Sequence, residues 1–241
     1  MNWVEWDSLP PQFRNSAVRP YYEVLRNKRG SMLFKRAFDV SVSVVLLLLL
    51  SWLMLLIALA IRLESSGPVF FRQVRVTQYG RQFRIFKFRT MVIFAEGSSL
   101  EITVKGDRRI TKVGSFIRGK RLDELPQLFD VLLGRMSFVG PRPEVVRYVE
   151  TFSGEELATL MVPAGITSSA SVAFRNEDQL LEGASDVDSA YIERVLPRKM
   201  QFNLEDVRLF SIKRDCRILA STVLAVFGPR SARYEIGKTV Q

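Results

Sequence analysis

The stretch VSVSVVLLLLLSWLMLLIALAI, from Val40 to Ile61, decides how the rest of the chain can fold. It runs for 22 residues without a charged side chain and is bounded by Asp39 and Arg62. A helix of this length rises about 33 Å, enough to cross a hydrocarbon core that is about 30 Å thick. Helices buried inside soluble proteins rarely stay uncharged for so long. The stretch therefore predicts a helix inserted into a membrane.

Basic residues on both sides of this stretch favour a bent helix. Lys35 and Arg36 precede it, and Arg62, Arg72 and Arg75 follow it. Basic flanks tend to stay in the cytoplasm, and a single span must leave one of these flanks on the other side. A re-entrant helix, which enters the membrane, bends and leaves on the same side, keeps both flanks together. The length and continuity of the stretch favour a span, so both topologies stay open.

The chain divides into four regions. Residues 1–34 mix aromatic and basic side chains with prolines, which suits either an interfacial N-terminal arm or a poorly ordered one. Residues 35–65 hold the membrane-inserted helix, residues 66–227 have the patterns of a mixed, helix-rich α/β domain, and residues 228–241 form a polar tail. The predicted fold is a small α/β domain attached to one membrane helix.

Hydrophobic periodicity predicts the elements of the α/β region. Residues 69–71 and 83–89 have strand character. Residues 92–106 are predicted to form a loop, and residues 122–132 a helix that ends near Gly134. Residues 144–161 are predicted to be helical, and residues 185–227 mostly helical with an interruption at Pro197.

Charge and residue types limit the chemistry. The chain has 35 Lys and Arg against 25 Asp and Glu, and Arg62–Arg121 contains fourteen basic residues against four acidic ones. Such local charge predicts an anionic partner: nucleic acid, anionic lipid or a phosphorylated substrate. The absence of histidine excludes a Ser-His catalytic pair and His metal ligands. The one cysteine, Cys216, shares helical spacing with Ile212 and Leu219 and is predicted to be a buried thiol.

An acidic pair among basic residues is the leading candidate for chemistry: Arg118-Gly-Lys-Arg-Leu-Asp123-Glu124-Leu-Pro126-Gln127. Pro126 is tolerated only in the first turn of a helix, so the two acids lie at or just before a helix start. Backbone amides there favour anions, which predicts an ionised carboxylate beside a phosphate. The pair suits general acid–base catalysis or carboxylate attack on a phosphoryl group with a divalent metal. The alternative is an ordinary helix cap.

Two further motifs carry basic groups. In Val139-Gly-Pro-Arg-Pro143, prolines on both sides fix the backbone around Arg142, which limits the entropy lost when its guanidinium grips a phosphate. In Phe86-Lys-Phe-Arg-Thr-Met91, Lys87 and Arg89 share one face of a strand. Alone, each motif is also compatible with a structural role, as a stiff loop or as a half-buried strand with a solvated basic face.

Taken in order, the motifs of this chain resemble those of the bacterial sugar transferases, or monotopic phosphoglycosyl transferases. That family has Lys-Arg-x-Phe-Asp before a hydrophobic membrane helix, and Ser-x-Gly-Pro-Val-Phe-Phe-x-Gln after it. Three further motifs follow in that family: Phe-Lys-Phe-Arg-Thr-Met, Asp-Glu-Leu-Pro-Gln and Met-Ser-x-Val-Gly-Pro-Arg-Pro. This chain has the corresponding motifs at residues 35–39, 66–73, 86–91, 123–127 and 136–143, and the resemblance covers residues 35–225.

The resemblance implies an enzyme that moves a sugar 1-phosphate from a UDP-sugar to undecaprenyl phosphate, a polyprenyl phosphate, and releases UMP. Asp123 matches the family nucleophile, which forms a covalent phosphosugar intermediate, and Glu124 matches the acid that holds Mg²⁺. The other matches are to residues that bind substrate or phosphate: Lys87, Arg89, Arg118, Gln127, Arg142 and Arg175.

The resemblance also implies a location and partners. The catalytic domain would face the cytoplasm at the bacterial inner membrane, and its product would start a lipid-linked glycan that downstream glycosyltransferases extend. No nucleic-acid partner is implied, and a homodimer is compatible with the sequence. A function of another class stays open: a membrane-anchored, non-enzymatic protein whose basic stretch binds anionic lipid or nucleic acid. Such a protein would not require the acidic pair.

The chain departs from the family pattern at two places. The family's membrane helix carries a central Ser-Pro pair, where this chain has Ser51-Trp52. Without a proline, a bend must come from the hydroxyls of Ser41, Ser43 or Ser51, which compete for backbone carbonyls. The second departure lies in residues 163–176, where the family's glycines are partly replaced. The match at Arg175 is correspondingly weaker.

Overall fold

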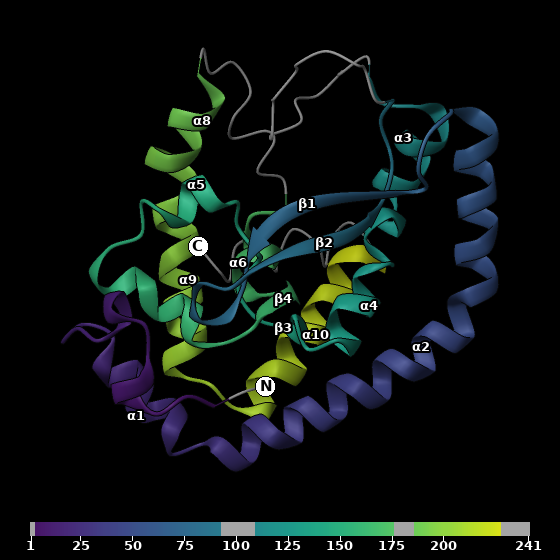
Figure 1. Ribbon diagram of the computed structural model, residues 1–241. Coiled ribbons are helices and arrows are strands. Elements are labelled where there is room, and N and C mark those ends of the chain that lie inside the picture. Colours follow the sequence, from purple (N-terminus) through teal and green to yellow (C-terminus); the bar gives the residue numbers. More distant parts are fainter. Residues whose placement is uncertain (1–2, 93–108, 176–185, 228–241) are drawn as a thin grey trace.

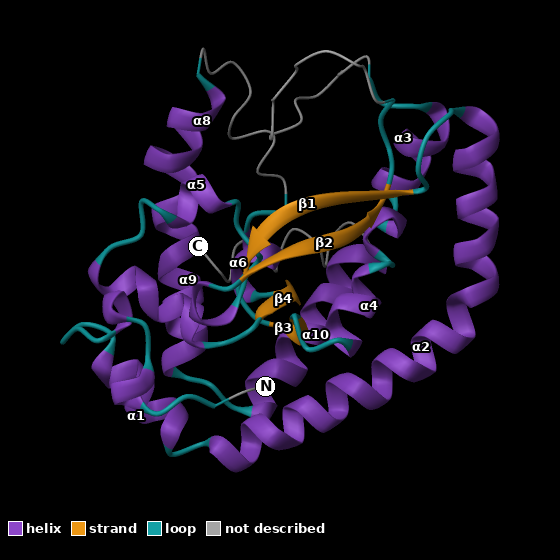
Figure 2. Ribbon diagram, in the orientation of Figure 1, coloured by secondary structure: helices purple, strands orange, loops and turns teal. Residues whose placement is uncertain are grey.

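A computed structural model describes residues 3–92, 109–175 and 186–227 of the chain. Helices dominate these residues, and their four short strands form two separate two-stranded sheets (Figure 2). The helix-rich α/β architecture predicted from the sequence is confirmed. All but the first residue of the loop predicted at 92–106, and the whole tail from residue 228, lie outside the described residues.

The apolar stretch lies in α2 (Arg29–Glu64), a helix of 36 residues. Within the described chain, α2 is the one helix that is long and apolar enough to cross a membrane. A straight helix of this length would extend about 54 Å. Figure 1 shows instead that α2 turns sharply, so that its C-terminal part rises along one side of the domain toward α3.

Two serine hydroxyls in α2 donate to backbone carbonyls of the preceding turn. Ser51 lies at the bend and donates to the Leu48 carbonyl at 2.9 Å, and Ser43 donates to the Asp39 carbonyl at 2.6 Å. Side chains that bind carbonyls in this way weaken the regular helical ladder and bend the helix. The hydroxyls of Ser43 and Ser51 therefore make the type of bond that the sequence suggested for a bend without proline.

The N-terminal part of α2 is fastened to α4 (Gln127–Leu132) and α10 (Ile212–Phe227). Arg36 donates to the last two carbonyls of α4, at 2.6 and 2.8 Å, and so satisfies acceptors that a helix end leaves unpaired. Lys35 is buried and pairs with Asp215 of α10 at 2.6 Å. These bonds hold the start of the apolar stretch against the domain.

The C-terminal end of α2 is fastened to the same domain. Glu64 accepts hydrogen bonds from the first two amides of α3 (Lys112–Gly119), at 2.8 and 3.0 Å. Arg89 donates to the carbonyls of Ser65 and Ser66, each at 2.7 Å. Because both ends of α2 are tied to one domain, the bend is part of the fold.

The outer face of α2 is exposed although it is apolar. A soluble core helix hides its apolar side chains, whereas only 17% of the most apolar window of α2 is buried. The buried side chains come from the inner face, which includes Met54, Ile57 and Ile61. The exposed apolar side chains of α2 include Leu48, Leu49, Trp52, Leu55, Leu56 and Leu59.

Two small sheets carry the basic motifs. β1 (Phe70–Val76) and β2 (Gln82–Phe88) pair in antiparallel fashion. This confirms the strand predicted at 83–89, whereas β1 extends five residues beyond the predicted 69–71. β3 (Met136–Val139) and β4 (Ala164–Thr167) pair in parallel. Just after β3, a Cβ atom on Gly140 would lie 2.3 Å from the Pro163 carbonyl oxygen. Glycine at position 140 therefore permits a close approach that fixes where the following loop leaves the sheet.

The N-terminal residues contribute to the largest core. Phe13, Tyr22 of α1 (Arg19–Arg26) and Leu25 are buried in one cluster with Val195 and Met200. The aromatic side chains that suggested an interfacial or poorly ordered arm therefore pack against the domain. The same cluster brings in several shorter elements: α5 (Val146–Val149), α8 (Val187–Ala190), a π-helical turn (Tyr191–Val195), α9 (Leu196–Arg208), and 3₁₀ turns at Trp6–Ser8, Pro11–Phe13, Gln78–Gly80 and Gly154–Met161.

Two helix predictions need correction. Residues 144–161 are not one helix, because Ser153 and Glu156 form a capping box that starts a new 3₁₀ turn after α5. Pro197 does not interrupt the C-terminal helices, because it lies in the first turn of α9. The amide hydrogen that proline lacks would have no partner within the helix at that position. The break falls instead between α9 and α10, at residues 209–211.

The prediction that Cys216 is buried is wrong, because the thiol is exposed on α10. The inward face of this helix contains Asp215, which pairs with Lys35, and Thr222, which is 2.7 Å from the Thr167 hydroxyl. Ile218 lies buried between these two positions. Polar residues thus occupy inward positions, and an apolar pattern alone selects the wrong face.

Candidate active site

The acidic pair lies in one tight turn before α4. Residues Leu122–Glu124 form a 3₁₀ turn, and Pro126 is the N-cap of α4, as its position in the sequence predicted. Arg121 precedes the turn in the left-handed conformation, with φ of 57°. This conformation costs a residue with a side chain about 1–2 kcal/mol. Such strain persists only where the surroundings enforce it, and it is common at functional sites.

Glu124 is the centre of a cluster of positive charges. Its Oε1 atom accepts from Arg142 at 2.7 Å and from Lys87 at 3.1 Å, and Arg121 lies 3.9 Å away. Burial alone would raise the pKa of Glu124, but Arg142 and Lys87 outweigh it and hold the pKa well below its usual range. The structure thus brings Lys87 and Arg142, two residues singled out in the sequence, onto one ionised carboxylate.

Asp123 has a different environment although it is the next residue in the chain. Its carboxylate accepts no hydrogen bond from any described residue. Burial, and next the charge of Glu124, raise the pKa of Asp123, while Lys87, Arg118 and Arg121 lower it. The sequence predicts that Asp123 is ionised, and this prediction stays open because burial raises the pKa without fixing the protonation state. A carboxylate with a raised pKa is more basic and hence a stronger nucleophile once it is ionised.

The loop that carries Arg142 is held from two sides. Gly165 of β4 donates its amide to the Pro141 carbonyl at 2.8 Å, and Arg75 of β1 donates to the Pro143 carbonyl at 3.1 Å. The prolines limit the remaining backbone freedom. The loop is therefore rigid where Arg142 projects from it toward Glu124.

A buried polar group that the sequence did not reveal supports this loop. Glu144 accepts from the Tyr191 hydroxyl at 2.8 Å and from the Lys199 ammonium at 3.3 Å. Only 3% of Lys199 is exposed, so the pair is shielded from water. Burial would raise the pKa of Glu144, but Lys199 outweighs it and lowers the pKa. No local pattern links residues 144 and 199, which are brought together by the packing of α9 on the core.

The other predicted site residues have different surroundings. Arg118, at the end of α3, is close enough to lower the pKa of Asp123. Arg89 is buried and directs its bonds to the end of α2. Gln127 is 1% exposed, and its side-chain nitrogen has no partner within the described chain. Arg175 follows α6 (Ser169–Ala173) and donates to the Ala225 carbonyl of α10. Phosphate binding by Arg89 and Arg175 stays a prediction.

The donor set around the pair fits a divalent cation that also contacts substrate. In the described chain, no group of three or more Cys, Asp or Glu side chains forms a self-contained metal site. Mg²⁺ is usually held by one or two carboxylates together with water and substrate phosphates. Glu124 engages its cations through Oε1, and Asp123 accepts no bond from the described residues. Carboxylate oxygens thus remain for such an ion.

Comparison with known proteins assigns the chain to a family. Residues 30–229 match the profile of the family described as bacterial sugar transferase. This chain belongs to the bacterial sugar transferase family, which is membrane-associated. The matched residues include α2, the acidic turn and the Arg142 loop.

Several curated proteins are similar to this chain. A UDP-glucose:undecaprenyl-phosphate glucose-1-phosphate transferase of Klebsiella pneumoniae is 37% identical over 206 residues, which are 84% of this chain and 42% of the relative. A UDP-N-acetylgalactosamine-undecaprenyl-phosphate N-acetylgalactosaminephosphotransferase of Aeromonas hydrophila is 37% identical over 218 residues, 86% of this chain and 48% of the relative. A UDP-glucose:undecaprenyl-phosphate glucose-1-phosphate transferase of Caulobacter vibrioides is 36% identical over 192 residues, 78% of this chain and 68% of the relative. The chain thus spans less than half of the first two relatives.

Proposed function

We propose that this chain transfers a sugar 1-phosphate from a UDP-sugar to undecaprenyl phosphate and releases UMP. The observation that carries the proposal is the acidic turn. There, Glu124 accepts from Lys87 and Arg142, and the Asp123 carboxylate accepts no hydrogen bond from the described residues. One carboxylate thus organises the charges, and its neighbour is available to react. The names of the relatives support the same reaction class.

In the first step, an oxygen of the Asp123 carboxylate attacks the sugar-bearing phosphorus of the UDP-sugar. The bond from that phosphorus to the bridging oxygen breaks, UMP leaves with the electron pair, and a phosphosugar remains on Asp123 as an acyl phosphate. Lys87, Arg118 and Arg142 surround the turn and would stabilise the negative charge on the phosphoryl oxygens. Mg²⁺ held by Glu124 would neutralise charge that otherwise repels an anionic nucleophile.

In the second step, a phosphate oxygen of undecaprenyl phosphate attacks the same phosphorus. The bond to Asp123 breaks, its carboxylate is regenerated, and undecaprenyl diphosphate sugar is released. The step needs soluble donor and lipid acceptor at one site. The exposed apolar face of α2 supports this, because it suits a domain that rests in the surface of a bilayer.

The proposal includes a location at the bacterial inner membrane, with the catalytic domain in the cytoplasm. UDP-sugars are cytoplasmic donors, and both basic flanks of α2 would then lie on the cytoplasmic side. The non-enzymatic alternative is not favoured by the arrangement of charges. Binding to lipid or nucleic acid through a basic stretch does not require a carboxylate, whereas here Glu124 lies among the cations and accepts from Lys87 and Arg142.

The substitution Asp123→Asn tests the nucleophile. It keeps the size of the side chain but removes the attacking charge, so we expect UMP release to fall by about three orders of magnitude or more. The assay uses purified protein, Mg²⁺, undecaprenyl phosphate and a panel that includes UDP-glucose and UDP-N-acetylgalactosamine. Asp130→Asn, at a buried acid on α4, is a control for general damage. If the Asp123 variant releases UMP at a near-parental rate, the assignment is wrong.

A further inference from the structure

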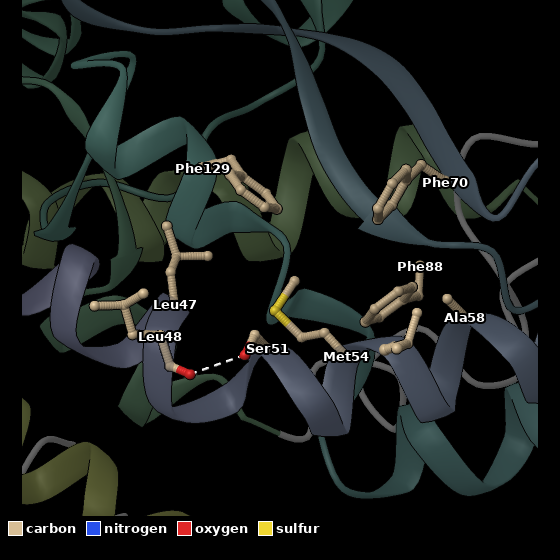
Figure 3. A pocket seen from close by; sticks show the side chains of 9 residues that line it. Leu47, Leu48, Ser51, Met54, Ala58, Phe70, Phe88 and Phe129 are labelled. Carbon is tan, nitrogen blue, oxygen red and sulfur yellow. Dashed lines mark hydrogen bonds between the residues drawn. The ribbon is translucent and has the colours of Figure 1, made fainter.

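An apolar cavity of about 400 Å³ lies on the inner side of the bend in α2 (Figure 3). Leu47 and Leu48 lie on one arm of the helix, Met54 and Ala58 lie on the other, and Ser51 is at the turn between them. Side chains of β1, β2 and α4 close the opposite side. The lining residues are Leu47, Leu48, Ser51, Met54, Leu55, Ala58, Phe70, Phe88 and Phe129.

The chemistry of the lining selects an apolar occupant. Ser51 is the one polar residue in the wall, and its hydroxyl already donates to the Leu48 carbonyl. Phe70 and Phe88 stack at 5.5 Å between ring centroids and 20° between planes, which gives the cavity a flat hydrocarbon wall. The cavity is partly open to its surroundings, and its volume is that of a pocket for a small ligand. A hydrocarbon chain fits both observations.

The elements that wall the cavity lead to the acidic turn. Lys87, whose ammonium is 3.1 Å from Glu124, precedes Phe88 on β2, and its side chain points to the other face of the strand. Leu122 and Leu125, on either side of the acidic pair, pack on the cluster that contains Phe88 and Met54. A chain in the cavity would therefore place a head group beside the acidic turn. The cations there suit a phosphate head group.

We propose that this cavity binds the isoprenoid units next to the phosphate of the acceptor lipid. The inference rests on the proposed function and adds a site for the lipid chain to it. The exposed side chains of Leu48 and Leu55 lie at the rim, so the chain can enter sideways from the bilayer. The bend in α2 thus forms one wall of a lipid site as well as holding the helix at the membrane.

Filling the cavity tests the proposal. Ala58→Phe places a ring inside it, and Ala60→Phe is the matched control, because residue 60 lies about 200° around the helix from residue 58 and outside the lining. We expect the KM for undecaprenyl phosphate to rise roughly ten- to hundredfold in Ala58→Phe, because the ring would displace from the cavity a part of the lipid chain equal to a few methylene groups. The KM for the UDP-sugar and the amount of UMP released in the burst without acceptor should stay within twofold in both variants. Equal acceptor KM values in the two variants would overturn the proposal.

Cross-linking of the unaltered chain provides a second readout that does not depend on turnover. The probe is a polyprenyl phosphate with a photoreactive group on its first isoprene unit, in vesicles of phosphatidylethanolamine and phosphatidylglycerol. We expect adducts at Met54 or Phe88, competed by undecaprenyl phosphate. Adducts confined to outer residues such as Trp52, or competition by phospholipid alone, would show that the cavity is not an acceptor site. If the parent chain transfers no sugar phosphate but adducts form in the cavity, the proposed function fails and the lipid site stands.

Discussion

Asp123 and Glu124 are adjacent, yet their surroundings shift the two pKa values in opposite directions. Arg142 and Lys87 outweigh burial at Glu124 and lower its pKa, whereas burial dominates at Asp123 and raises its pKa. Pairs of acids with separated pKa values commonly divide two roles between them. Here the strongly acidic Glu124 suits a fixed charge, and the more basic Asp123 suits the group that forms a bond.

The raised pKa of Asp123 predicts the pH dependence of the first step. The nucleophile acts ionised, so the UMP burst should fall as the pH drops through this raised pKa, above the value of about 3.9 for a solvated Asp. Arg118 lowers the pKa of Asp123, so Arg118→Gln should move the acid limb to higher pH. The burst is measured without acceptor, because the acceptor phosphate titrates too. An acid limb at the same pH in the parent and in Arg118→Gln would contradict this.

A second residue-scale prediction concerns Glu124. Glu124→Gln removes the anion that accepts from Lys87 and Arg142, and we expect a loss of about 2 kcal/mol in the free energy of unfolding, less than for a fully buried pair. UMP release should need more Mg²⁺ or cease, and chelation should stop the parent enzyme. The double variant Glu124→Gln, Arg142→Gln should regain part of the stability but no activity. Unchanged stability of Glu124→Gln in denaturant melts would refute the charge-cluster explanation.

At the scale of elements, the bend in α2 needs no proline. In a regular helix the amide of residue 52 would use the Leu48 carbonyl, which here also accepts from the Ser51 hydroxyl. A proline at position 52 would remove a hydrogen bond that is already weakened. The Ser51-Trp52 pair of this chain therefore accompanies a bend of the kind that a proline would also permit.

This bend predicts the effect of proline along α2. Trp52→Pro should keep UMP release and the thermal midpoint close to those of the parent, because residue 52 follows the bend. Leu56→Pro, in the arm beyond the bend, should destabilise the fold by about 3 kcal/mol. Both positions are exposed, so packing differs little between them. Equal damage by the two substitutions, in melts of the detergent-solubilised protein, would show that the bend does not depend on the Leu48 carbonyl.

Sequence patterns predicted the elements whose signal is local. Strand alternation located β1 and β2, and Pro126 located the start of α4. Features that depend on distant partners were missed. Cys216 was expected to be buried because a pattern of apolar residues does not show that Asp215 faces inward to Lys35.

In the candidate site, too, local motifs were predicted from the sequence and contacts between distant residues were not. The motifs predicted that Lys87, Glu124 and Arg142 belong to one site, and the structure brings all three together. The Glu144–Lys199 pair that supports the Arg142 loop joins residues far apart in the chain, so no motif contained it. The bonds of Arg89 to the end of α2 were likewise invisible, because a basic residue beside phosphate motifs suggests a ligand first.

At the scale of the whole molecule, the two tethered ends of α2 predict its topology. Single cysteines replace Ser8, Gly30 or Ser66 in a Cys216→Ser background, because Cys216 is itself exposed. All three positions are exposed, and a Cβ atom at Gly30 meets nothing within 4 Å. In intact cells we expect no labelling by an impermeant maleimide, and full labelling after permeabilisation. Labelling of residues 8 and 30 but not 66 in intact cells would establish a span.

The bonds at the two ends of α2 also constrain the order of events during synthesis. Arg36 requires carbonyls about 95 residues later in the chain, and Lys35 requires Asp215, 180 residues later. When α2 leaves the ribosome none of these partners exists, and the nascent helix has the length and hydropathy of an ordinary span. The topology of α2 can therefore be fixed by these bonds only after the later residues have been synthesised. A chain stalled on the ribosome before α3 would have an α2 that is free to cross the bilayer. If both ends of α2 lie on one side of the membrane, as we expect, the bonds to the later-synthesised domain would hold the C-terminal end of α2 on that side.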